Sequence, residues 1–393
     1  MGSFMRSIVL SFLIAAALFH HTPDTKADPP SFTGLGELVG EEISGIPTGV
    51  SGDGSVIVGP NGKTAAFRWS ANTGLIDLDM GSGQNLLQMV FEGFSPRVSQ
   101  DGFTVVGSRI LDFEVEASRW TESGGVVVLN DLPALHFQSR ARDVSADGAV
   151  IVGYAESNLG AQAFRWTEGE GLVPLGDLSG GSINSVATAV SADGSTIAGN
   201  GESASGPEAF RWTEATGMVG LGALDAINHY SQAHNISADG NVIVGVSSSG
   251  GGYQPFRWTE ESGMVGLGTI SDSGTMFEAY FGSYAVSGDG STIVGSWFVD
   301  DQGAQAFLWA ETHGMRGLKD VLVSDYGLDL LGWELSSAID ISDDGRTIVG
   351  YGLSPGGGIQ GWVAVVPEPS SIVLAGVGLV FVVAAGIRRR RHG

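Results

Sequence analysis

The chain repeats one sequence pattern seven times. Each unit has the form Val-Ser-x-Asp-Gly-x-x-Ile-Val-Gly, a polar stretch, Ala-Phe-Arg-Trp-Thr, a short turn and Leu-Gly-x-Leu, and the units run from about Pro47 to Val366. The Asp-Gly steps begin at Asp53, Asp101, Asp147, Asp193, Asp239, Asp289 and Asp344. The tryptophans that follow them are Trp69, Trp120, Trp166, Trp212, Trp258, Trp309 and Trp362. A period near 46 residues predicts an array of stacked supersecondary units.

Residues 187–224 are the most regular unit and predict four short strands, at 187–191, 196–199, 209–213 and 218–224. The Asp193-Gly194 step predicts a hairpin turn, for which it would supply the positive φ angles. Residues 200–208 are polar and glycine-rich and are expected to connect the second strand to the third. A four-stranded sheet of this size cannot bury its faces alone, so it requires neighbouring units.

A shift of phase between the two ends favours a closed ring. The last unit stops after its third strand, at Gly361-Trp362-Val363, and the missing strand is matched near the other end, where Phe32–Leu38 resembles Met218–Leu224. We therefore predict an all-β fold: a seven-bladed β-propeller of four-stranded antiparallel blades, closed by an N-terminal strand that completes the last blade. An open antiparallel solenoid is the alternative, but such an array gains nothing from the permuted strand.

The first 27 residues are typical of a secretory signal peptide. Arg6 supplies the positive charge, residues 8–19 are apolar, and Thr25-Lys26-Ala27 precedes a predicted cleavage site. An uncleaved anchor is the alternative, although twelve apolar residues are short for a membrane span. The predicted domains are thus the signal peptide (1–27), the propeller (28–366) and a C-terminal segment (367–393).

The C-terminal segment combines three features in a fixed order. Pro367, Glu368 and Pro369 precede an apolar stretch at 372–387 that predicts a transmembrane helix, and Arg388, Arg389, Arg390 and Arg391 follow as a stop-transfer cluster. These residues resemble the PEP-CTERM sorting signal. The resemblance implies an exosortase as partner, which cleaves near the motif, and a secreted or cell-surface location after a transient membrane anchor. A permanent tail anchor is the alternative.

The repeat itself resembles the HAF-type extracellular repeat, through Ala-Phe-Arg-Trp and Gln-Ala-Phe in the third strand. This resemblance spans about 320 residues and implies an exported bacterial protein of no settled activity. The histidine that gives the repeat its name is absent: glutamine precedes Ala163-Phe164 and Ala306-Phe307. No role can therefore be transferred to such a histidine.

Charge and cysteine content limit the classes of partner and chemistry. Residues 28–366 contain 13 basic and 41 acidic residues, a net charge near −28, so nucleic acid is not an expected partner. The chain has no cysteine, which excludes disulfides and a thiol nucleophile. An exported ring of this kind must be stabilised by burial and closure.

The repeated polar motifs are interpreted as structural. Each Asp-Gly turn offers a single carboxylate where Ca²⁺ needs six to eight oxygens, so no metal site is predicted, and bound calcium is kept as the alternative. The Arg-Trp pairs are expected to pack between blades, with sugar stacking as the alternative. His136, His229, His234 and His313 do not form a standard zinc pattern. Gly352-Leu353-Ser354-Pro355-Gly356 has the spacing Gly-x-Ser-x-Gly, but it runs into a glycine-rich stretch that is expected to be a loop, so no nucleophile elbow is predicted.

In an up-and-down blade, the turns after the first and third strands share one face. The connections after the second strand and between blades share the other, and three of these are long and variable, at 79–97, 271–284 and 320–335. We call this second side the loop face, and it is the expected binding face. Tyr280, Phe281, Tyr284, Trp297 and Trp333 are the candidates for a sugar-stacking surface there, with ring capping as their alternative role.

The sequence therefore predicts a non-enzymatic cell-surface or extracellular matrix protein that binds exopolysaccharide or other envelope components. Its processing partners would be signal peptidase, the secretion machinery and an exosortase. A polysaccharide hydrolase or lyase on the same scaffold is the alternative, because carboxylate pairs can occur anywhere in so acidic a chain. A spacer without a ligand is a third interpretation.

Overall fold

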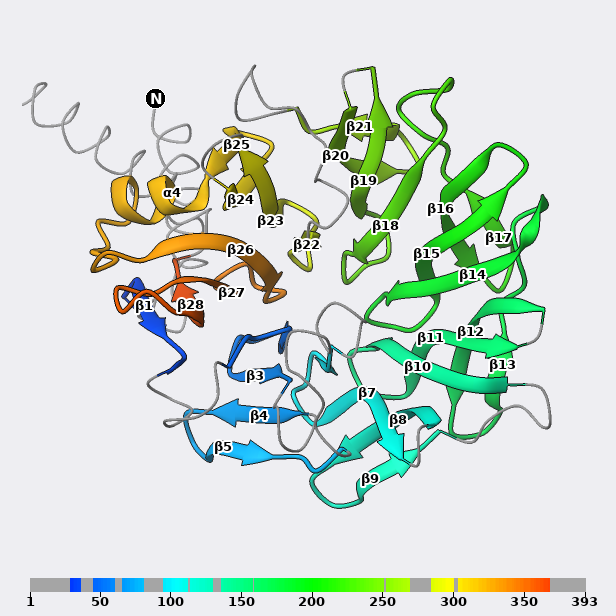
Figure 1. Cartoon of the computed structure of the whole chain (residues 1–393), viewed down its shortest axis with the longest axis horizontal. Coiled ribbons are helices and arrows are strands. Elements are labelled where there is room, and N and C mark those ends of the chain that lie inside the picture. Colours follow the sequence, from blue (N-terminus) through cyan, green and yellow to red (C-terminus); the bar gives the residue numbers. More distant parts are fainter. Residues whose placement is uncertain are drawn as a thin grey trace, which may run out of the picture.

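Seven four-stranded antiparallel sheets surround a central axis (Figure 1). The computed structural model describes residues 29–36, 45–60, 66–80, 95–111, 114–129, 136–157, 159–250, 252–268, 284–299 and 303–367. The predicted all-β, seven-bladed propeller is thereby confirmed. The first strands of successive blades contact one another around the axis, and Figure 1 shows them innermost.

The blades follow the order of the sequence. Blades 1 to 3 are β2 (Gly49–Val50), β3 (Val56–Gly59), β4 (Phe67–Ser70), β5 (Gly74–Asp77); β6 (Arg97–Val98), β7 (Thr104–Leu111), β8 (Glu114–Thr121), β9 (Gly125–Val128); and β10 (His136–Val144), β11 (Val150–Ser157), β12 (Gly160–Thr167), β13 (Gly171–Pro174). Blades 4 to 6 are β14 (Gly180–Val190), β15 (Thr196–Ser203), β16 (Gly206–Thr213), β17 (Gly217–Gly220); β18 (Ser231–Ile236), β19 (Ile243–Ser249), β20 (Gly252–Thr259), β21 (Gly263–Gly266); and β22 (Tyr284–Val286), β23 (Thr292–Val299), β24 (Gly303–Ala310), β25 (Gly314–Gly317). Blade 7 is β26 (Glu334–Ile341), β27 (Thr347–Leu353), β28 (Ile359–Val365) and β1 (Ser31–Gly34), and helix α4 (Leu318–Ser324) lies between blades 6 and 7 in the sequence.

The hydrophobic core is divided among the seven seams between blades. Trp166 of blade 3, for example, packs with Val106, Ala117 and Leu129 of blade 2. Equivalent clusters place Trp69, Trp120, Trp212, Trp258, Trp309 and Trp362 against the preceding blade. The predicted packing role of the repeated tryptophans is confirmed. Because every seam uses both neighbours, no blade buries its apolar surface alone.

β1 closes the ring by pairing antiparallel with β28, from Ser31 opposite Val365 to Gly34 opposite Trp362. The ring of Phe32 packs edge-on against Trp333, with centroids 5.7 Å apart, and Leu35 is buried in the seam between blades 7 and 1. The predicted closing strand is confirmed, and residues 37 and 38 of the predicted segment lie outside the described residues.

Each Asp-Gly turn is held by the same hydrogen bonds. In blade 4, Ser191 Oγ donates to Asp193 Oδ1 at 2.7 Å, and the Ser195 N–H donates to the same oxygen at 2.9 Å. The prediction that both residues of the step take positive φ was wrong: only the glycine does, with φ 72° at Gly194. The aspartate keeps an ordinary backbone conformation because its side chain caps the turn.

A closed ring of seven backbone hydrogen bonds joins these turns around the axis. They run from the N–H of Gly52 to Gln100 O, Asp101 to Ala146, Ala146 to Ala192, Ala192 to Ala238, Ala238 to Gly288, Gly288 to Asp343, and Asp344 back to Gly52, over 2.9 to 3.4 Å. Gln100 Nε2 also donates to Asp343 Oδ1 at 3.2 Å, past Gly52. The ring constricts the axis at the turn face.

The connections after the second strands are shorter than predicted. In blades 2 to 5 only two residues separate the second and third strands, and the expected 200–208 segment pairs instead, from Asn200 opposite Ala209 to Ser203 opposite Gly206. These strand ends extend beyond the apolar seams, so their residues can be polar while their backbones remain paired. Variable length on the loop face comes mainly from the connections between blades.

No helix within the described residues is long and apolar enough to span a membrane. The predicted C-terminal span at 372–387, Glu368, Pro369 and the arginine cluster lie outside those residues, as do residues 1–28. The seven seams and the closing strand all lie within residues 29–367.

Candidate functional site

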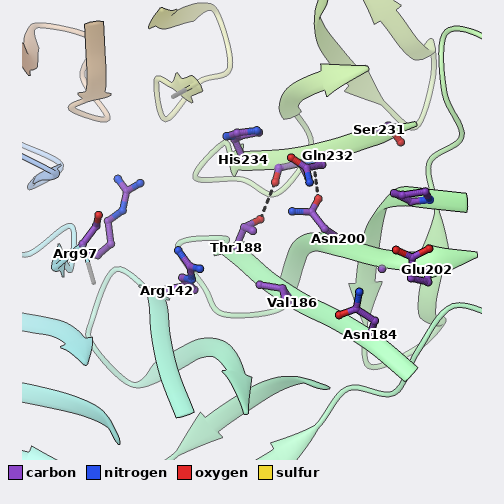
Figure 2. A pocket seen from close by; sticks show the side chains of 14 residues that line it. Arg97, Arg142, Asn184, Val186, Thr188, Asn200, Glu202, Ser231, Gln232 and His234 are labelled. Carbon is purple, nitrogen blue, oxygen red and sulfur yellow. Dashed lines mark hydrogen bonds between the residues drawn. The ribbon is translucent and has the colours of Figure 1, made fainter. Parts of the chain in front are cut away.

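A pocket of about 470 Å³ opens beside the axis on the loop face. It is lined by the middle and second half of β14, the beginning of β18, the end of β15 and the start of β16, and it is reached by side chains from β6 and β10 (Figure 2). The lining residues are Ser95, Arg97, Arg142, Asn184, Val186, Thr188, Asn200, Gly201, Glu202, Pro207, Ser231, Gln232, Ala233 and His234. We call this space the axial pocket. Its lining is dominated by amides, hydroxyls and cationic groups.

Hydrogen bonds between blades 4 and 5 fix one wall of the axial pocket. Thr188 Oγ1 donates to Ala233 O at 3.0 Å, and the Ala233 N–H donates to Asn200 Oδ1 at 2.7 Å (Figure 2). Because Asn200 accepts through its oxygen, its amide nitrogen remains to donate to a ligand. A polar group held in this way keeps its orientation without a ligand.

A smaller cavity lies deeper along the axis and shares Arg97, Thr188 and His234 with the axial pocket. Asp143 and Asp340 line it, and each caps the next blade: Asp143 Oδ2 accepts from the Val190 N–H at 2.8 Å. Asp340 Oδ2 likewise accepts from the Val50 N–H at 3.0 Å. Two carboxylates therefore join blade 3 to blade 4 and blade 7 to blade 1.

Arg97 is the principal cation near these carboxylates. Its Nη1 lies 3.5 Å from Asp340 Oδ2. Burial raises the pKa of Asp143 to about 6, although the charge of Arg97 and two backbone N–H donors act against this shift. Burial also raises the pKa of Asp340. The axial carboxylates are therefore more readily protonated than ordinary aspartates.

Arg142 and His234 face the axial pocket with unsatisfied polar atoms. The Nε of Arg142 and the Nε2 of His234 are shielded from solvent and have no hydrogen-bond partner among the described residues. The Arg142 guanidinium lies 5.4 Å from the centroid of the Tyr154 ring, and burial lowers its pKa. Burial, together with the charge of Arg97, lowers the pKa of His234 to about 4, so this imidazole is neutral at pH 7.

The aromatic residues suggested by the sequence are placed differently. Tyr284, Trp297 and Trp333 are 3%, 5% and 7% exposed, and they pack in the clusters at the blade 5–6 and 6–7 seams. Tyr280 and Phe281 lie outside the described residues. A stacking role for these residues stays a prediction, and in the structure the three described rings are part of the core.

The histidines do not come together. His229 Nε2 lies 3.3 Å from Glu208 Oε2, His313 contacts Thr312 at the surface, and His234 lies at the axis. Within the described part of the chain, no group of three or more His, Asp and Glu side chains is arranged to hold a metal ion. This observation does not test the alternative that calcium binds at the Asp-Gly turns.

Sequence reasoning did not identify the axial polar residues. They occupy the two positions that precede the repeated Val-Ser, where the units carry Arg97, Arg142-Asp143 and His234-Asn235 in place of small or apolar residues. Comparing the seven units position by position would have shown that these first-strand positions vary strongly next to a constant motif. That variation is the available signal for a site at the axis.

Comparison with known proteins identifies the C-terminal signal and the fold. Residues 365–391 match the PEP-CTERM protein-sorting motif, which confirms that predicted resemblance. The signal implies processing by an exosortase and an extracellular or cell-surface destination. Among curated proteins no relative matches the sequence.

Several solved structures resemble this chain at low sequence identity. An oligogalacturonate lyase in complex with manganese is 14% identical, with a TM-score of 0.51 over 86% of this chain and 97% of that one. TolB structures from Agrobacterium tumefaciens and Acinetobacter baumannii are 16% and 12% identical, each with a TM-score of 0.42. The match to the Agrobacterium tumefaciens structure covers 69% of this chain and 89% of that one. The match to the Acinetobacter baumannii structure covers 80% of this chain and 81% of that one. This chain is therefore a seven-bladed propeller that carries a PEP-CTERM sorting signal.

Proposed function

We propose that the protein is a non-enzymatic cell-surface or extracellular matrix component that binds exopolysaccharide or other envelope components through the loop face of its propeller. On this proposal, signal peptidase and the secretion machinery export it, and the C-terminal segment anchors it in the membrane until an exosortase acts. The observation that carries the binding function is the axial pocket, with its amide and hydroxyl lining.

The architecture supports ligand entry from this side. At the turn face, seven backbone hydrogen bonds and the Gln100–Asp343 bond constrict the axis. At the loop face, the axial pocket is open and bordered by polar side chains on paired strands. Sugar hydroxyls need donors and acceptors of this kind, held by a rigid scaffold.

An enzyme acting on polysaccharide is the second candidate. Asp143 and His234, whose pKa values are shifted to about 6 and about 4, lie around one axial cavity, and shifted groups of this kind are frequent at catalytic sites. The structural neighbour named an oligogalacturonate lyase gives this alternative a concrete substrate class. Retention of an intact polymer and release of new chain ends distinguish the two functions.

The test uses residues 29–367, which contain the closing strand and all seven seams. The propeller is incubated with a panel of bacterial exopolysaccharides, with and without calcium, and both co-sedimentation and new reducing or unsaturated ends are measured. We expect polymers to be retained with their length unchanged. Release of new ends would establish the enzyme instead, and the absence of any interaction would leave a sorted scaffold without this ligand.

A further inference from the structure

Three arginines gather near the axis of a strongly acidic protein. The chain carries a net charge of −24, yet Arg97 and Arg142 both line the axial pocket, and Arg140 lies over the same Tyr154 ring as Arg142. Two of them are already paired: Arg97 with Asp340, and Arg140 with Glu156 at 3.1 Å. The charge of Arg142 is the one left without a carboxylate partner among the described residues.

The surroundings of Arg142 indicate that its charge can attract an anionic ligand. Its favourable partner is Tyr154, through a side-chain hydrogen bond and through the ring, and the nearby charges of Arg140 and Arg97 are of like sign. A cation held away from water costs free energy unless an anion or several hydrogen bonds compensate for it. The shielded Nε, which lacks a hydrogen-bond partner, adds to that cost. An anion in the axial pocket, which Arg142 lines, would compensate for its charge.

The rest of the pocket specifies more than a simple ion. Asn200 and His234 present polar atoms across from Arg142, and Asn184 and Gln232 add two amides along the wall (Figure 2). Glu202 lines the outer end of the pocket, well apart from Arg142 in the view of Figure 2. Since it repels negative charge there, a ligand with one acidic group is oriented with that group toward the axis.

We propose that the axial pocket binds an acidic sugar unit, with the sugar carboxylate against Arg142 and the sugar hydroxyls against Asn200, Gln232 and His234. One guanidinium without a carboxylate partner matches the single charge of a carboxylate, and its planar fork can hold both carboxylate oxygens. A volume of about 470 Å³ is in the range of small-molecule sites. This inference deepens the proposed binding function and rests on it for the polymer that would supply the sugar.

The decisive comparison uses two ligands of nearly equal shape. Isothermal titration of the 29–367 propeller with glucuronate, with its neutral analogue glucuronamide and with glucose measures what the carboxylate contributes. We expect glucuronate to bind at least about 10-fold more tightly than glucuronamide, as charge-assisted hydrogen bonds to arginine predict. Equal affinity for the acid and the amide would overturn the inference, and this comparison needs no variant.

Two variants then test whether Arg142 causes the preference for glucuronate over glucuronamide. Arg142→Gln removes the unpaired charge and should abolish the preference for glucuronate over glucuronamide. Arg165→Gln is the matched control, because it removes the same charge from an exposed pair with Glu170 and should leave the preference intact. A preference that survives Arg142→Gln would assign the carboxylate to another site.

The inference and the proposed function fail separately. If polymers are retained but glucuronate shows no advantage over its amide, the binding function stands and the acidic-sugar site is wrong. If glucuronate binds through Arg142 but no polymer is retained, the site is right and the polymer-binding function is wrong. The absence of both interactions overturns both.

Discussion

At the scale of single residues, the turn glycines separate two physical effects. Gly194 and Gly217 both have positive φ, 72° and 66°. A Cβ at Gly194 would lie 2.5 Å from Val150 Cγ2 of the preceding blade, whereas a Cβ at Gly217 would have no neighbour within 4 Å. Alanine at Gly217 therefore meets only the backbone cost, about 1 kcal/mol. Alanine at Gly194 meets the same cost and a collision across the seam.

We predict that Gly194→Ala lowers the free energy of unfolding by about 2–4 kcal/mol, and Gly217→Ala by about 1 kcal/mol. Urea denaturation of the two variants in parallel measures the difference. Equal losses would mean that the turn does not pack against blade 3 as described.

The sequence could predict the turn residues but not the pocket residues. Asp193 and Gly194 recur with fixed neighbours, so repetition reveals their role. Arg142 and His234 occur once each at a varying position, and a single such residue has no pattern to identify it. Their significance comes from the circular arrangement of the blades, which brings these two residues, 92 positions apart in the sequence, to one pocket.

At the scale of elements, β1 is the strand on which closure depends. It contributes one backbone ladder to blade 7, and Phe32 and Leu35 contribute to the seams on either side of that blade. Deleting residues 29–36 should therefore lower the melting temperature far more than the loss of eight terminal residues usually does. Differential scanning calorimetry measures the change.

Two point variants control for the deletion. Leu35→Ala, directly after β1, removes a side chain that is 1% exposed and should cost about 2–5 kcal/mol, whereas Thr33→Ala, at an exposed position of β1, should cost less than about 0.5 kcal/mol. An unchanged melting temperature after the deletion would show that β1 does not hold the ring closed.

The elements that escaped prediction are the polar ends of strands. Residues 200–208 lack apolar alternation, so a pattern based on burial predicts a loop there. In the structure, β15 and β16 extend through this segment because each backbone has a paired neighbour. Alternation of apolar and polar residues identifies strands with one face on the core. These strand ends border the axial pocket instead, so they lack that pattern.

At the scale of the whole molecule, aspartates whose pKa is lowered and aspartates whose pKa is raised have opposite effects on stability as pH changes. Hydrogen bonds from the Ala149 N–H and from Ser145 lower the pKa of Asp147, and the pKa of Asp193 is lowered in the same way, so such groups stabilise the fold once ionised and lose this effect as pH falls. Burial, with the charges of Asp340 and Asp344, raises the pKa of Asp343 to about 6. The folded state then binds a proton more readily than the unfolded state, so stability from this group is present below about pH 4 and is lost as pH rises through 6.

The final prediction isolates the axial group through Asp343→Asn, which keeps an oxygen to accept the hydrogen bond from Gln100. Between pH 4 and pH 7, the stability of the wild type relative to this variant should fall by about 1–2 kcal/mol, a value reduced for solvent screening at a partly exposed group. Urea denaturation at several pH values measures it.

Asp147→Asn is the control of opposite sign: relative to it, the wild type should gain stability as pH rises toward 4. The comparison between variants also cancels the opposing effect of His234, whose pKa is lowered to about 4 and which favours the folded state as pH rises. A difference between wild type and Asp343→Asn that is constant over this range would mean that Asp343 is ionised throughout, and that the turn end of the axis is open to water.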